Sequence, residues 1–109
     1  MFIWRNRALG YLLTLLLLPA YVFAAPQRIV SLTPHITEML FAIGAGKQVI
    51  ATDQASDYPD EVKKLPKVAN YQSLNSESLL AVKPDLVVAW GSTQALMQQQ
   101  IQALGIPML

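Results

Sequence analysis

Aromatic and amide side chains gather in the polar segments that separate apolar runs of this chain. Gln54 and Tyr58 lie in one such segment. Tyr71 and Gln72 lie in the next, and Trp90 directly follows a short apolar run. Rings interspersed with amides suit a large, flat, partly apolar ligand better than a small charged one. The other interpretation is that Tyr58 and Trp90 pack at the ends of elements, and the residue types leave both open.

His35 is the single histidine, and the chain has no cysteine. A structural metal site needs several such ligands, so we expect no metal site here. His35 at a helix start favours a local hydrogen bond, while axial contact with a haem or a cobalt stays open. Ser31 and Ser92 have no arranged base, and the glycines of 44–46 follow a helix rather than a strand. We therefore predict a binding protein without catalytic residues, not an enzyme.

The segments that must position these side chains alternate between two periodicities. Short apolar runs, two of them rich in β-branched residues, predict strands at 29–32, 49–52, 67–69 and 86–89. Helical patterns and breakers predict helices after 33, 59, 75 and 93, ending near 43, 65, 82 and 104. The short apolar run at 106–109 predicts the start of a further strand. This alternation predicts an α/β fold with a parallel, Rossmann-like sheet in one lobe.

The first helix carries the clearest signals. Thr33 and Pro34 are typical of an N-cap and a first helical residue, and Gly44 is typical of a C-terminal stop. One apolar face is predicted by residues at helical spacing, namely Ile36, Met39, Leu40 and Ile43. In a parallel sheet, ligands sit beyond the carboxyl ends of the strands. The loops that carry the aromatic and amide side chains are all at such ends.

The apolar content of 53% is concentrated at the N-terminus. Arg5 and Arg7 precede an apolar run over 8–23, and Val22-Phe23-Ala24 has the small-x-small form of a cleavage site. We predict a signal peptide over 1–24 and cleavage after Ala24, with a retained anchor as the alternative. The remaining chain is close to neutral, which gives no electrostatic footprint for nucleic acid. Without cysteine there is no lipid attachment, so no membrane anchor is expected after cleavage.

Several motifs together resemble a known family. The segments IVSLTPHITEMLFAIGAG, SDYP, KKLPKV and NSESLLAVKPDLVVAW are similar to the N-terminal lobe of the periplasmic receptors for cobalamin and iron-siderophores. These receptors supply ATP-driven (ABC) importers. SDYP, the pair Tyr71-Gln72 and the position of Trp90 resemble the cobalamin branch.

The resemblance implies a periplasmic substrate-binding component that binds cobalamin and delivers it to an inner-membrane permease. It implies that Tyr71, Gln72 and Trp90 line the cobalamin cleft, together with Tyr58 and Gln54. Gln54 departs from the aromatic residue that is common at its place. Glu77 matches the glutamate that docks this lobe on the permease.

The family has two lobes joined by a long helix, so residues 25–109 correspond to the N-terminal lobe alone. The resemblance therefore implies a truncated receptor, whose own binding activity would be weak without the second lobe. Two alternatives stay open: a haem or ferric-siderophore receptor lobe, and a remnant that keeps the fold without a ligand. The candidate loops contain no arginine, which siderophore sites use for their anionic ligands.

Overall fold

The computed structural model describes residues 25–91 and 94–109, and the predicted leader over 1–24 lies outside the described residues. Four parallel strands form one sheet in the order β3-β2-β1-β4. The strands are β1 (Ile29–Ser31), β2 (Val49–Asp53), β3 (Lys67–Ala69) and β4 (Leu86–Val88). The α-helices are α2 (Pro34–Ala42), α3 (Ser76–Ala81) and α4 (Ala95–Ala103), and short 3-10 turns are η2 (Gly46–Gln48) and η3 (Asp60–Lys64). The predicted α/β fold with a parallel sheet is confirmed.

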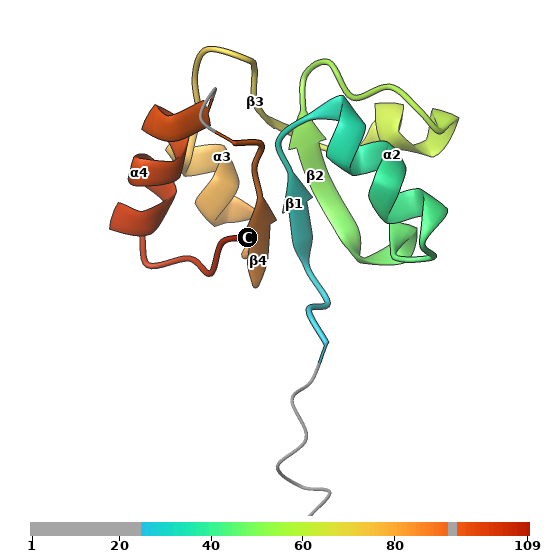
Figure 1. Cartoon of the computed structure of the whole chain (residues 1–109), viewed down its shortest axis with the longest axis horizontal. Helices are drawn as coiled ribbons and strands as arrows, with labels where there is room; N and C mark the ends of the chain where they lie inside the picture. Colours follow the sequence, from blue (N-terminus) through green and yellow to red (C-terminus); the bar gives the residue numbers. More distant parts are fainter. Residues whose placement is uncertain (1–24, 92–93) are drawn as a thin grey trace, which may run out of the picture.

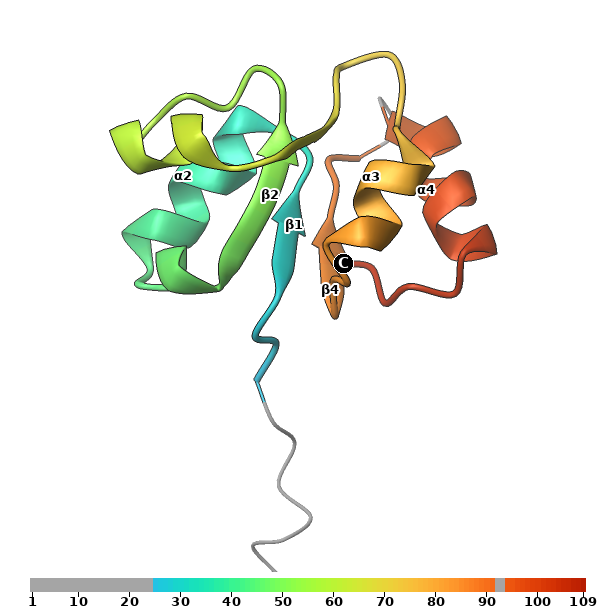
Figure 2. The same cartoon turned by 180° about the vertical axis from the view of Figure 1, so that it is seen from behind.

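The helices lie on both sides of the sheet (Figures 1 and 2). Helices α3 and α4 cover one face, where they bury the main apolar core. Val30 of β1 and Leu32, which directly follows β1, belong to this core with Leu79 of α3 and Ile101 of α4. Each of these four side chains is at most 1% exposed. Burial of one such side chain stabilises the fold by roughly 1.5–3 kcal/mol.

Helix α2 covers the opposite face, but only part of its apolar face is buried. Ile36 and Thr37 are its buried residues, whereas Met39 is 53% exposed and Ile43 is 77% exposed. Met39 and Ile43 therefore belong to the predicted apolar face but are not covered by another element. Their side chains border an open groove between α2 and β4, which Leu86 and Val88 also line. Helical spacing defines an apolar face, but another element must pack on it before it is buried.

The predicted helix signals are confirmed at their ends. The Thr33 side chain accepts a hydrogen bond from the Ile36 N–H at 3.3 Å, and Asn75 caps α3 through the Ser78 N–H at 3.0 Å. Helix α2 ends before Gly44, whose φ of +87° suits glycine because it has no Cβ. The segment after Pro59 forms a 3-10 turn instead of an α-helix. The start of the predicted fourth helix falls at 92–93, outside the described residues.

Both ends of the described chain are tied to β4. The Asp85 carboxylate accepts hydrogen bonds from the N–H groups of Gln27 at 2.9 Å and Arg28 at 3.0 Å. These bonds hold the pKa of Asp85 below its usual value. At the other end, Met108 forms a parallel bridge with Val87, which confirms the predicted start of a further strand. Within the described residues, no helix has the length and apolar character needed to cross a membrane.

Candidate ligand-binding site

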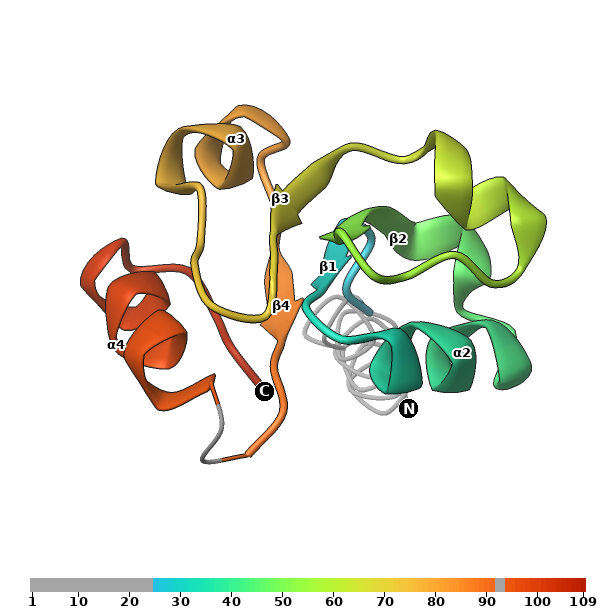
Figure 3. The same cartoon turned by 90° about the horizontal axis from the view of Figure 1, so that it is seen from above.

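The order of the strands creates a place where loops diverge. The chain passes from β1 to β2 on one side and later returns to place β4 on the other side of β1. The segment after β1 enters α2 on one face, while the segment after β4 leads to α4 on the opposite face (Figure 3). Open α/β sheets bind ligands at such a switch point, beyond the carboxyl ends of the strands. The carboxyl ends of β1 and β4 are therefore the candidate ligand-binding site.

Trp90 and His35 meet at this switch point. Their ring centroids are 5.6 Å apart and the ring planes form an angle of 81°, an edge-to-face contact. Trp90 follows β4, and His35 lies in the first turn of α2. With Thr33 and Pro34 they line an open hollow of about 500 Å³. Trp90 is 53% exposed, so a ring surface remains accessible to a ligand.

Gln54 and Tyr71 are brought together in a second hollow at the same edge of the sheet. They line about 240 Å³ with Ala55 and Asn70. The Gln54 N–H donates to the Ala69 carbonyl at 2.7 Å, which joins the loop after β2 to the end of β3. The Tyr71 side chain is 80% exposed. The arrangement thus places an amide and a phenol ring at neighbouring strand ends.

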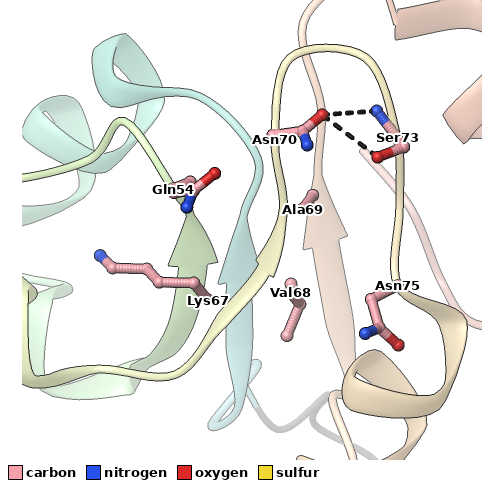
Figure 4. Close-up of a pocket in the computed structure, with 7 residues that line it drawn as sticks. All are labelled: Gln54, Lys67, Val68, Ala69, Asn70, Ser73 and Asn75. Carbon is pink, nitrogen blue, oxygen red and sulfur yellow. Dashed lines mark hydrogen bonds between the residues drawn. The ribbon is translucent and has the colours of Figure 1, made fainter.

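Asn70 holds the loop that carries Tyr71. Its side-chain oxygen accepts hydrogen bonds from the N–H groups of Gln72 and Ser73, each at 2.8 Å. The Ser73 hydroxyl donates to the same oxygen, as Figure 4 shows. An asparagine side chain that bonds backbone two and three residues on is typical of a fixed turn. This turn holds the backbone of Tyr71 and Gln72 in place.

Below the loop after β2 lies a buried polar network. The Thr37 hydroxyl is 2.8 Å from the hydroxyls of Ser31 and Ser56, and Ser56 donates to the Asp53 carboxylate. All four side chains are at most 3% exposed. In the described part of the chain, no buried side-chain nitrogen or oxygen lacks a hydrogen-bond partner. The network therefore fixes the loop without the cost of an unpaired polar group.

The Lys67 ammonium group closes this network from β3. Its Nζ donates to the Thr52 hydroxyl and the Ser56 carbonyl at 2.8 Å, and to the Val62 carbonyl at 3.1 Å. Burial lowers the pKa of Lys67, while the negative charges of Asp53 and Asp57 act in the opposite direction. Lys67 lines a polar hollow with Gln54 and Asn75 (Figure 4). Because three acceptors surround its nitrogen, Lys67 is placed to support the loop.

The remaining predicted residues lie apart from these hollows or on the open surface. Tyr58 precedes a cis proline and is 65% exposed. Gln72 is exposed beside Tyr71, and only its backbone bond to Asn70 is defined. Glu77 is exposed in the first turn of α3, which agrees with a surface contact and equally with a favourable acid near a helix start.

Three residues that support the site were not predicted from the sequence, namely Ser56, Lys67 and Gln94. The network residues Ser56 and Lys67 come from a loop and an edge strand, and no local pattern joins them. Gln94 reaches across to the end of β1, where its Nε2 donates to the Leu32 carbonyl at 3.0 Å. Pairs this far apart in sequence leave no periodic signal.

Within residues 25–91 and 94–109, no acidic side chain, lysine or arginine lines the two ring-bearing hollows. Their side chains are aromatic, amide, hydroxyl or small apolar groups. Among the described residues, no group of three or more histidine or acidic side chains could hold a metal ion. The geometry therefore suits a large ligand with flat surfaces and a polar rim better than a small anion or a bare cation.

Comparison with known proteins gives consistent results. The family model described as "Periplasmic binding protein" matches residues 29–109. A vitamin B12-binding protein of Pectobacterium carotovorum subsp. carotovorum (strain PC1) is 52% identical over 89 residues, which are 80% of this chain and 32% of that protein. One of Yersinia pseudotuberculosis serotype O:1b (strain IP 31758) is 45% identical over 101 residues, 92% of this chain and 35% of that protein.

Solved structures agree with these matches. The periplasmic vitamin B12 binding protein BtuF of Vibrio cholerae has a TM-score of 0.72 and 38% identity, covering 77% of this chain and 33% of that one. A periplasmic heme binding protein from Pseudomonas aeruginosa has a TM-score of 0.67 and 28% identity, covering 78% and 31%. The chain thus spans about a third of the length of these relatives. On the match over 29–109 and the parallel α/β fold, the chain belongs to the periplasmic binding protein family.

Proposed function

We propose that this chain forms the N-terminal lobe of a cobalamin receptor that works with an ABC importer in the periplasm. The observation that carries the proposal is the pair of ring-bearing hollows at the carboxyl ends of the parallel strands. Trp90 lies in one hollow and Tyr71 in the other. The relatives at 45–52% identity are vitamin B12-binding proteins, which supports cobalamin as the ligand.

In this proposal, Trp90 and Tyr71 pack against the corrin and its side groups. Gln54 and Gln72 offer amide groups to the polar periphery, and Tyr58 lies at the margin of the site. Each buried ring would contribute on the order of 1–3 kcal/mol to binding. The complete receptor holds the ligand between two lobes, so tight binding requires the second lobe as well. The role is binding and delivery, without a chemical step.

A haem receptor lobe is the second candidate, because a heme binding protein is among the similar structures. Heme-binding proteins among the similar structures are 28–38% identical to this chain, whereas the vitamin B12-binding relatives are 45–52% identical. We favour cobalamin on this ground.

The proposal is tested with a hybrid protein. In this hybrid, residues 29–109 of the chain replace the corresponding third of the Pectobacterium carotovorum relative. Equilibrium dialysis against cyanocobalamin should show one bound ligand per hybrid, and Trp90→Ala should weaken binding about tenfold or more. The exposed Glu61→Ala, placed in η3, is the matched control and should bind as the parent does. A folded hybrid that retains no cyanocobalamin would reject the proposed function.

A further inference from the structure

The backbone of Trp90 is held by a buried amide. The Gln94 Oε1 accepts a hydrogen bond from the Trp90 N–H at 2.7 Å, while its Nε2 donates to the Leu32 carbonyl at 3.0 Å. The Gln94 side chain is 5% exposed. One side chain thus joins the segment after β4 to the end of β1. These are the two strands that flank the switch point, and they are already paired in the sheet. Gln94 adds a side-chain link between the segments that leave them.

The indole ring of Trp90 has a second neighbour. The His35 ring meets it edge to face at 5.6 Å, from the opposite side of the switch point. His35 is held by the first turn of α2, which the Thr33 side chain caps. Aromatic rings prefer edge-to-face over stacked face-to-face contact, so this contact favours one orientation of the indole.

These two contacts act on different parts of the same residue. Gln94 fixes the backbone of Trp90, and His35 restricts its ring. A ring held in place before binding loses less conformational entropy when a ligand packs on it, which raises affinity. His35 is itself exposed beside Trp90 and lines the same hollow of about 500 Å³. A ligand large enough to cover the indole therefore also reaches the imidazole.

We propose that Gln94 and His35 are positioning residues for Trp90, and that imidazole and indole together form one platform for a flat, polar-rimmed ring ligand. The second part rests on the proposed function, because it takes cobalamin as that ligand. The first part concerns the free protein and stands independently. His35 then has a role in binding through its ring, without coordination of a metal.

The positioning claim is tested in the full 109-residue chain carrying Trp4→Phe, so that Trp90 is the single tryptophan. Its near-ultraviolet circular dichroism reports how rigidly the indole is held. His35→Ala and Gln94→Ala should each reduce the Trp90 bands about twofold or more, while His35→Phe should keep them because it retains a ring. Glu38→Ala in α2 and Gln102→Ala in α4 are exposed controls and should change nothing.

Far-ultraviolet circular dichroism checks that each variant is folded. Gln94 is buried, so Gln94→Ala could unfold the chain. His35 is exposed, so His35→Ala should stay folded and still test the positioning claim. Trp90 bands of parental strength in His35→Ala would overturn the positioning claim. The platform claim is tested in the hybrid with cyanocobalamin as the probe. There His35→Ala should raise the dissociation constant about tenfold, His35→Phe should raise it less, and Glu38→Ala should leave it unchanged.

The two claims fail in different ways. A parental hybrid without cyanocobalamin binding rejects the proposed function and the platform with it, whereas the Trp90 spectra still decide the positioning claim. A hybrid that binds cyanocobalamin equally well with and without His35 rejects the platform alone.

Discussion

The Lys67 ammonium group donates a hydrogen bond to the Thr52 hydroxyl at 2.8 Å, between the neighbouring strands β3 and β2. The same nitrogen also donates to two backbone carbonyls, at Ser56 and Val62. Three segments that are separate in the sequence therefore meet at one side chain. The loop that carries Gln54 depends on this contact, because Ser56 belongs to it.

Replacement of Lys67 should destabilise the chain. Lys67→Met removes the donor from three acceptors, and we expect the free energy of unfolding to fall by about 1–3 kcal/mol. Lys64→Met, in the exposed turn η3, is the control and should change it by less than about 0.5 kcal/mol. Urea unfolding followed by far-ultraviolet circular dichroism measures both. Equal midpoints for Lys67→Met and the parent would show that the network does not support the fold.

The lowered pKa of Lys67 adds a pH test. A base whose pKa is lower in the folded state binds fewer protons there than in the unfolded state. The stability therefore rises as pH increases through the folded-state pKa toward the ordinary value of 10.5. Lys67→Met removes this rise, so its stability relative to the parent should fall further over that alkaline range. A constant difference between the two proteins would contradict the assignment.

The open apolar groove between α2 and β4 should promote self-association. Ile43 lies on it with 77% exposure, and exposed apolar patches are a known cause of aggregation. Ile43→Lys should reduce self-association in sedimentation velocity and leave the unfolding midpoint nearly unchanged. Leu80→Lys adds the same charge on α3, where Leu80 is 48% exposed and lies away from the groove. It should reduce self-association less than Ile43→Lys does. Equal effects of both substitutions would assign the benefit to net charge alone.

Much of the fold could be predicted because its signals are local. Thr33 and Asn75 cap helices within three residues of their own position. The apolar run at β1 is short and continuous, as expected for a strand buried on both faces, and all three residues of β1 are buried. The exposure of Met39 and Ile43 could not be predicted, since the spacing of residues on a helix says nothing about what packs against it.

The site was predictable only in part. Trp90, Tyr71 and Gln54 were predicted as ligand contacts because rings and amides in loops after strands are visible in the sequence. The three residues line hollows at strand ends, and their contact with a ligand stays a prediction. The contact of His35 with Trp90 and the bridge from Gln94 to Leu32 join residues more than 50 positions apart. Such contacts depend on the order β3-β2-β1-β4, and no local pattern fixes that order.

Export with cleavage after Ala24 stays a prediction, because residues 1–24 lie outside the described structure. The arginines before the apolar run and the Val22-Phe23-Ala24 end support it. Mass spectrometry of the periplasmic fraction should find a chain that begins at Ala25. A chain that keeps Met1 and remains in the membrane fraction would mean that the leader is an anchor.

Glu77 provides a test of the permease contact. Its carboxylate is exposed on α3, and we expect it to face a basic surface of the permease. In the hybrid, Glu77→Lys should lower stimulation of the importer's ATPase several-fold and leave cyanocobalamin binding unchanged. Glu61→Lys places the same charge change in η3 and serves as the control. Similar losses with both variants would point to a general charge effect and not to a docking residue.

The central claim is that this lobe is built for cobalamin. Calorimetric titration of the hybrid with cyanocobalamin and, separately, with haemin tests it most directly, because both ligands are large and flat and differ in what surrounds the ring. We expect one cyanocobalamin bound per protein, with a dissociation constant at least about tenfold lower than that for haemin. This ratio corresponds to a difference in binding free energy of about 1.4 kcal/mol. Tighter binding of haemin than of cyanocobalamin would contradict it and favour the haem receptor.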